Sequence, residues 1–156
     1  MKRREFIKNS AILGTVVALG SALNLNAEQN LANSNQGKSM TKIKITIKDK
    51  EFTAVFSDNA TTKEMIEKMP FEVQMQDLYE RELCYRFGGG AFSVDETTST
   101  GYEIGDIAYW PPRGSLVILY EQNGEKFERV HLGKIEQSVE SLKNIGDVKV
   151  KFEVLR

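Results

Sequence analysis

The sequence contains few of the residues on which disulfide, zinc or nucleic-acid chemistry depends. One cysteine and one histidine among 156 residues exclude an intramolecular disulfide framework and a Cys/His zinc site. Lys and Arg total 21 against 22 Asp and Glu, so no excess of positive charge exists to drive nucleic-acid binding. Three prolines and twelve glycines exclude a collagen-like or low-complexity chain. The 40% of hydrophobic residues and 28% of charged residues are typical of one globular domain.

The chain begins with a basic segment that is followed by an uncharged, apolar one. Residues 11–25, AILGTVVALGSALNL, contain no charge. A basic head before such a run predicts a secretory signal peptide, which we place over residues 1–27. The alternative is an uncleaved membrane helix, but the run is shorter than the roughly 20 apolar residues that a spanning helix needs. No stable membrane anchor is therefore expected after cleavage.

The basic segment resembles the twin-arginine export consensus. Arg3 and Arg4 are followed by a spacer, then by Phe6, an aliphatic residue and Lys8. The resemblance implies that the twin-arginine translocation machinery is a partner during export. It also implies a periplasmic or secreted location.

A linker and a β-rich domain follow the apolar run. Residues 28–40 are rich in Asn, Gln, Ser and Gly without an apolar period, which predicts a flexible linker. Within residues 41–156, Ile43, Ile45 and Ile47 alternate with polar residues, as in a half-buried strand. Similar apolar patterns predict strands over residues 52–56, 71–75, 83–87, 107–110, 116–120, 127–131 and 148–154.

Two short helices are also expected. Thr61 with Glu64 is a capping-box pattern, and it predicts a helix over residues 62–69. A second helix is expected over residues 136–143, with Ile135, Val139 and Leu142 packing inward. Asn123-Gly124 predicts a hairpin that joins strand 116–120 to strand 127–131.

Eight short strands and two short helices favour a mainly β fold. The economical architecture is a closed or nearly closed eight-stranded barrel with two short capping helices, because closure removes exposed strand edges. Such a barrel is filled by side chains, so a ligand is expected on its outer face. We expect the ligand between the long loop of residues 88–101 and the turn of residues 109–113.

One block resembles a known family. Residues 101–120, GYEIGDIAYWPPRGSLVILY, are similar to the G-Y-x-x-G-D-I-A-Y-[YW]-x-P-x-G-x-L-x-[IL]-x-Y block of small bacterial cyclophilin-like proteins. The resemblance spans residues 41–156 and implies a cyclophilin-type barrel. It does not imply prolyl isomerisation, because the F-M-x-Q-G-G-D-F type segment of true prolyl isomerases has no match here.

The candidate binding residues are aromatic and arginine side chains. Trp110, the only tryptophan, and Arg113 could bind a peptide, a proline ring or a planar ligand by stacking. Arg86 could donate hydrogen bonds to the twisted imide of an isomerase transition state. The other candidates are Phe92, Tyr102 and Tyr109.

Each candidate also has a structural explanation. Tyr109 or Trp110 could fill the barrel, Arg86 could be a solvated strand residue, and the 88–101 loop could merely cover the barrel end. Cys84 and His131 show no nucleophile-and-base signature, so no catalytic residue is assigned, and no cofactor or metal is expected.

The sequence therefore favours a non-enzymatic module that binds a peptide or a small ligand. The alternative is a peptidyl-prolyl cis-trans isomerase with a rebuilt active site, because isomerisation requires no nucleophile, metal or proton shuttle.

Overall fold

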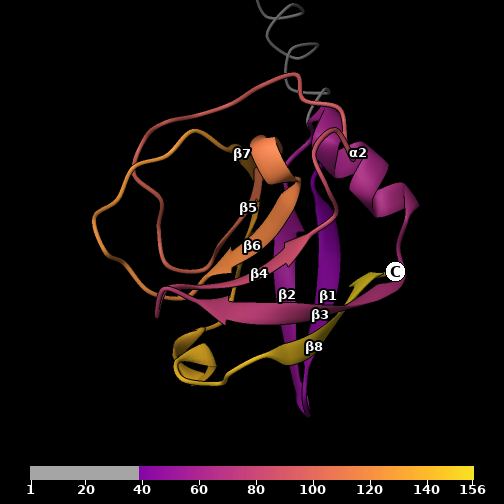
Figure 1. Cartoon of the computed structure of the whole chain (residues 1–156). Coiled ribbons are helices and arrows are strands. Elements are labelled where there is room, and N and C mark those ends of the chain that lie inside the picture. Colours follow the sequence, from indigo (N-terminus) through magenta and orange to yellow (C-terminus); the bar gives the residue numbers. More distant parts are fainter. Residues whose placement is uncertain (1–38) are drawn as a thin grey trace, which may run out of the picture. The chain divides into compact units, whose positions relative to one another are not determined.

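A computed structural model describes residues 39–156, and Figure 1 shows its elements. The predicted signal peptide and residues 28–38 of the predicted linker lie outside the described residues. The strands are β1 (Thr41–Ile47), β2 (Lys50–Phe56), β3 (Phe71–Leu78), β4 (Glu82–Arg86), β5 (Asp106–Trp110), β6 (Ser115–Leu119), β7 (Val130–Ile135) and β8 (Val148–Val154). One α-helix, α2 (Ala60–Glu67), and two 3₁₀ turns, η1 (Pro111–Arg113) and η2 (Glu140–Leu142), complete the described part of the chain.

The eight strands form a closed antiparallel barrel. Their order is β1-β2-β7-β5-β6-β4-β3-β8, and β8 pairs back to β1 with Ile43 opposite Val154 and Ile47 opposite Val150. This closure confirms the barrel predicted from the alternating strands. It satisfies the backbone groups of both terminal strands, so the sheet has no free edge.

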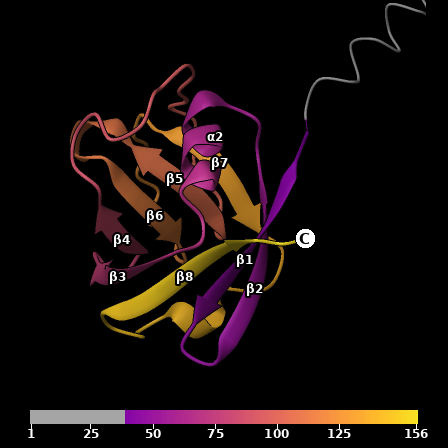
Figure 2. The same cartoon turned by 90° about the vertical axis from the view of Figure 1, so that its right-hand side faces the viewer.

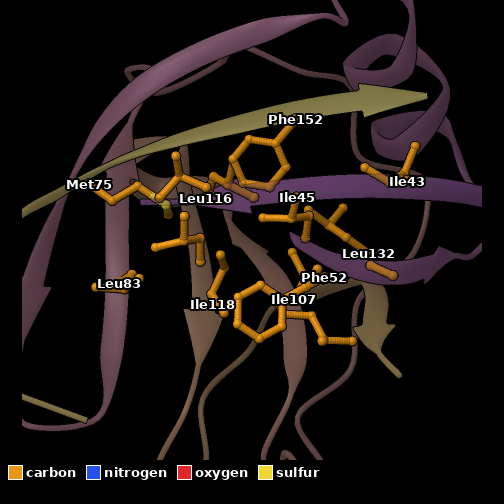
Figure 3. Close-up of a cluster of buried hydrophobic side chains, with 14 of the residues drawn as sticks. Ile43, Ile45, Phe52, Met75, Leu83, Ile107, Leu116, Ile118, Leu132 and Phe152 are labelled. Atoms are coloured by element: carbon orange, nitrogen blue, oxygen red, sulfur yellow. The ribbon is translucent and has the colours of Figure 1, made fainter. Parts of the chain in front are cut away.

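The alternation of side chains fills the barrel. Ile43, Ile45 and Ile47 of β1 point inward and are fully buried, whereas Lys44 and Thr46 between them point outward. Every strand contributes to the core, and Figure 3 shows Met75, Leu116 and other side chains converging inside the barrel. Each fully buried aliphatic side chain stabilises the fold by about 1.5–3 kcal/mol. The packed interior excludes a ligand, so a binding site has to lie on the outside.

Helix α2 packs against β7 at one end of the barrel (Figure 2). The expected helix is confirmed, but it begins two residues earlier and has a different cap. Asn59 accepts a hydrogen bond from the Thr62 N–H (2.9 Å), and the Thr62 hydroxyl accepts one from the Asn59 N–H (3.0 Å). Glu64 instead accepts from the Ser93 N–H (2.9 Å), which ties the loop after β4 to the helix.

The expected second helix, residues 136–143, is wrong. The segment contains only the 3₁₀ turn η2, although Val139 and Leu142 are buried as expected. Ile135, the third apolar residue of the predicted face, belongs to β7, where its N–H donates to the Gly105 carbonyl (2.9 Å). Two remaining apolar side chains are too few to hold a helix of this length against the core.

The expected hairpin at Asn123-Gly124 is also wrong. β7 begins at Val130 and pairs with β5 and β2 rather than with β6. The Tyr102 hydroxyl accepts from the Asn123 N–H (3.1 Å) and donates to the Glu121 carbonyl (3.0 Å). These bonds hold residues 120–129 as a loop, so the turn sequence joins no paired strands.

A close approach of two glycines fixes the loop after β4 to the turn before β6. Gly114 has a φ of 60°, and a Cβ atom there would lie 1.9 Å from the Gly88 carbonyl oxygen. The Phe87 N–H donates to the Gly114 carbonyl (2.9 Å), and the Gly88 N–H donates to the Arg113 carbonyl (3.2 Å). The barrel therefore requires glycine at position 114.

We expect Gly114→Ala to lower the free energy of unfolding by about 2 kcal/mol more than Gly124→Ala does. Both glycines have a positive φ, so both variants incur a left-handed backbone cost of roughly 1–2 kcal/mol. Only Gly114 has a backbone neighbour that an added methyl group would meet. Urea unfolding of the two variants measures the difference, and equal losses would contradict the close approach.

Candidate ligand-binding site

The outer face of β4, β5 and β6 has an apolar cluster of its own. The cluster consists of Cys84, Tyr102, Ala108, Val117 and Leu119, with Leu78 and Phe127 packed against it. A solvated barrel face is ordinarily polar, so this cluster requires a cover. The loops of residues 87–105 and 120–129 lie beside this part of the barrel and supply that cover (Figure 1).

A cavity of about 380 Å³ remains on this face where the cover ends. Its volume lies within the range of small-molecule sites, roughly 300–1,000 Å³. The lining residues are Tyr79, Arg81, Glu82, Cys84, Arg86, Trp110, Ser115, Val117, Glu125 and Phe127. The cavity thus combines an apolar floor with two arginines and two glutamates.

Residues that lie opposite one another on β4, β6 and β5 form rows across the floor of the cavity. Arg86 lies opposite Ser115, which lies opposite Trp110 on its other side. Cys84 lies opposite Val117 in the next row. Glu82 begins the third row, because alternate residues of β4 point to the same face. One end of the floor is therefore basic and aromatic, its middle is apolar, and its other end is acidic.

The acidic end is a buried ion-pair network. Arg81 and Glu82 are only 7% and 5% exposed. The Arg81 guanidinium donates from Nε (3.0 Å) and Nη2 (2.6 Å) to Oε2 of Glu82, and from Nη1 to Oε2 of Glu125 (2.5 Å). The rings of Phe127 and Tyr79 lie 5.4 and 5.5 Å from the guanidinium carbon. This network fixes the loop of residues 120–129 against β4.

Burial raises the pKa of the Glu82 carboxyl, and the charge of Arg81 opposes that shift. Burial also raises the pKa of the Cys84 thiol, whose side chain lies in the cavity floor and is 2% exposed. A thiol in that environment remains protonated and is a poor nucleophile.

At the basic end, Arg86 is exposed and only weakly held. The one hydrogen bond of its side chain within residues 39–156 goes from Nη1 to Oε1 of Gln76, at 3.4 Å. Within the same residues, no carboxylate oxygen lies within 4.0 Å of its guanidinium nitrogens. Trp110 is half-buried in the same row. The guanidinium is therefore available to an incoming anion.

Arg129 fastens the two covering loops to each other. Its backbone pairs with Thr98, and its Nη1 donates to the carbonyls of Thr100 (2.7 Å) and Phe127 (3.2 Å). The side chain is buried, and burial lowers the pKa of its guanidinium. The position of Phe127 at the cavity thus depends on a residue outside the cavity.

The structure separates the residues that the sequence predicted for the site. Arg86 and Trp110 line the cavity. Phe92 and Tyr109 are buried in the barrel core, where their rings meet edge to face at 5.5 Å. Tyr102 is buried in the apolar cluster on the outer face, and its hydroxyl forms hydrogen bonds with the backbone of Glu121 and Asn123. Arg113 is exposed on η1 and does not line the cavity.

The 88–101 loop and the 109–113 turn, which the sequence predicted on either side of the ligand, contact each other. Gly88 and Arg113 are joined by a backbone hydrogen bond, and a Cβ atom on Gly89 would lie 3.1 Å from the Pro112 carbonyl oxygen. The 88–101 loop and the 109–113 turn are therefore in contact at these residues. The cavity lies on the outer face, and residues of the 120–129 loop rather than of the 88–101 loop line it.

Sequence reasoning missed Arg81, Glu82 and Glu125. β3 extends to Leu78, three residues beyond the predicted strand, and Tyr79 and Glu80 then form the turn into β4 with positive φ values of 59° and 50°. Such turns favour Asn and Gly, so Tyr79-Glu80 gave no turn signal. Without that turn, the neighbouring charges had no assigned position on the sheet.

Residues 39–156 contain neither a candidate membrane-spanning helix nor a candidate metal cluster. No helix of this part of the chain is both long and apolar enough to cross a membrane. In the same residues, no three His, Cys, Asp or Glu side chains come together in a way that could hold a metal ion.

Comparison with known proteins bears on the fold. A family model described as "Cyclophilin-like family" matches residues 45–153. A search of curated proteins found no match. The solution structure of a hypothetical protein from Archaeoglobus fulgidus is similar, with a TM-score of 0.58 and 17% sequence identity over 76% of this chain and 97% of the other. At this identity the similarity concerns the fold alone.

We expect Arg81→Met to destabilise the protein strongly and in a pH-dependent way. The variant leaves the buried Glu82 carboxylate without its main cation, which costs about 3–5 kcal/mol when the group is ionised. The pKa of Glu82 in the folded variant then lies further above its pKa in the unfolded chain. At pH values between these two pKa values, the native state binds more protons than the unfolded state does. Stability therefore falls as pH rises from about 4.5 through the folded-state pKa.

Urea unfolding at pH 5 and pH 8 measures this effect. The loss caused by Arg81→Met should be larger at pH 8 than at pH 5. In the matched double variant with Glu82→Gln, the pH dependence of the loss should flatten, because no buried carboxyl remains to titrate. An equal loss at both pH values in the single variant would contradict the coupling.

Proposed function

The chain belongs to the cyclophilin-like family, and on that premise we propose that its domain binds a peptide segment or a small ligand in the cavity over β4 and β6. The proposal rests on one observation. An apolar floor ends at Arg86, an exposed arginine with no carboxylate oxygen within 4.0 Å of its guanidinium in residues 39–156.

Aromatic and polar groups of the cavity serve different parts of such a ligand. Trp110 offers a ring face to an apolar or cationic group, and a stacking or cation–π contact there contributes roughly 0.5–2 kcal/mol. The Phe127 ring borders the cavity but already packs against the guanidinium groups of Arg81 and Arg129. Arg86 offers a planar fork of N–H donors to an oxygen anion. A few contacts of this size give an affinity on the order of micromolar or weaker.

The cavity favours binding over covalent catalysis. Cys84, the only thiol in the chain, is almost fully buried, and its raised pKa keeps it protonated. His131, the only histidine, lies on β7 and does not line the cavity. The cavity thus brings together no nucleophile and base.

Prolyl isomerisation is the second candidate. It is favoured by the position of Arg86 in the same row of the sheet as the half-buried Trp110, with Ser115 between them, since a guanidinium could stabilise a twisted imide. A protease-coupled assay on a proline peptide separates the two functions. We expect no acceleration over the spontaneous rate, whereas an acceleration that Arg86→Gln abolishes would establish the isomerase.

Because Trp110 is the only tryptophan and lines the cavity, its fluorescence reports on occupancy. We expect at least one member of a panel of short peptides and small aromatic compounds to change its emission saturably, at micromolar to millimolar concentration. Val117→Phe should weaken that binding at least tenfold, because the larger ring fills the floor.

The matched control is Val55→Phe, the same change on the outward side of β2, away from the cavity. It should leave the affinity unchanged. The proposed function fails if no panel member changes the emission, or if the two variants bind alike.

We also propose that the protein is exported through the twin-arginine pathway to the periplasm or beyond. Support comes from Arg3, Arg4, Phe6 and Lys8 ahead of the apolar run. Replacing both arginines with lysine preserves the charge but removes the guanidinium pair. We expect the precursor then to remain in the cytoplasm in cell fractionation, and unchanged export of the variant would refute this route.

A further inference from the structure

We propose that the cavity binds a short peptide of about three residues with both termini free. Its carboxylate would pair with Arg86, and its ammonium group would lie at the Glu82–Glu125 end. This inference rests on the proposed function and adds the ligand class. It follows from the order of charges along the outward side of β4.

The two ends of the cavity differ in charge. At the acidic end, Glu82 and Glu125 share one guanidinium, that of Arg81. Both ion pairs use the Oε2 atom of the glutamate, and neither Oε1 atom has a hydrogen-bond partner within residues 39–156. An ammonium group has three donors and suits such an unsaturated carboxylate pair.

Arg86 forms the opposite end. Within residues 39–156 its guanidinium has no ion-pair partner, and its contact with Gln76 is at the limit of a hydrogen bond. A carboxylate bound there by two parallel N–H donors would form the stronger, charge-assisted kind of contact. Trp110 and Ser115 lie in the same row of the sheet and border that position.

The distance between the ends suits a tripeptide. Glu82 and Arg86 are four residues apart on one strand, which is about 13 Å between their Cα atoms. An extended tripeptide spans about 10 Å. The difference of about 3 Å is within the reach of the long side chains at the two ends of the cavity. Between the ends lie Cys84 and Val117, whose backbone groups are already paired in the sheet. The middle of the cavity therefore favours an apolar side chain.

Ligands with a single kind of charge fit less well. A monoacid would make no contact with the free Oε1 atoms of the acidic end, and a phosphate-rich ligand would face Glu82 and Glu125. A simple cation would leave Arg86 without a partner. A zwitterion of the right length satisfies both ends, which is the form of complementarity that determines specificity.

Calorimetry with the tripeptide alanyl-leucyl-alanine tests the proposal at low ionic strength. The free peptide is compared with its C-terminal amide and its N-acetyl form, each of which lacks one terminal charge. We expect either modification to raise Kd at least fivefold. Added salt should weaken the free peptide more than the modified ones.

Variants assign each terminus to its end of the cavity. In Arg86→Gln, the free peptide and the amide should bind alike. In Glu125→Gln, the free peptide and the N-acetyl form should bind alike. Arg113→Gln is the matched control, because Arg113 is exposed and does not line the cavity, and it should change none of the values.

Two results would overturn the inference while the proposed function stands. One is equal binding of the three peptide forms to the unmodified protein. The other is no binding of any form although another panel compound changes the Trp110 emission through the same cavity. If neither the peptides nor any panel compound affects Trp110, the proposed function fails as well.

Discussion

Closure of the sheet between β1 and β8 is the constraint on which the rest of the structure depends. A closed eight-stranded barrel is filled by its own side chains, so its chemistry has to lie on an outer face. The outward side of β1 is polar, with Lys42 and Lys44, whereas β4, β5 and β6 present Cys84, Ala108 and Val117 outward. That apolar face requires a cover, and the cover is incomplete. The cavity with its two charged ends is the part of the face that the loops leave open.

The cover is held by a small number of polar contacts and one isolated backbone bridge, between Thr98 and Arg129, rather than by extended strand pairing. The Arg129 side chain joins the two loops, and the Tyr102 hydroxyl holds the turn at Asn123. Arg81 fixes the later loop to the barrel through Glu125, at the cavity itself. The same residues therefore determine both the fold of the loops and the shape of the site. A ligand that competes for Glu125 would act directly on this attachment.

The barrel could be predicted from the sequence because alternation such as that of Ile43, Ile45 and Ile47 is a local pattern with one structural meaning. The path of residues 120–129 could not, because it depends on Tyr102, which is distant in sequence and bonds to the Asn123 turn. Arg86 and Trp110 were identified by residue type and position. Phe92 and Tyr109 share those residue types but fill the core, since an aromatic side chain alone does not reveal which face it occupies.

The central claim is that ligands bind over the outward sides of β4 and β6. The most direct measurement is amide chemical-shift mapping of the isotope-labelled protein during titration with alanyl-leucyl-alanine. The account predicts saturating shifts in residues 82–86, 115–117 and 125–127 and in the side-chain N–H of Trp110, with little change in β1, β2 and α2. Shifts confined to β1, β2 and α2 would contradict it.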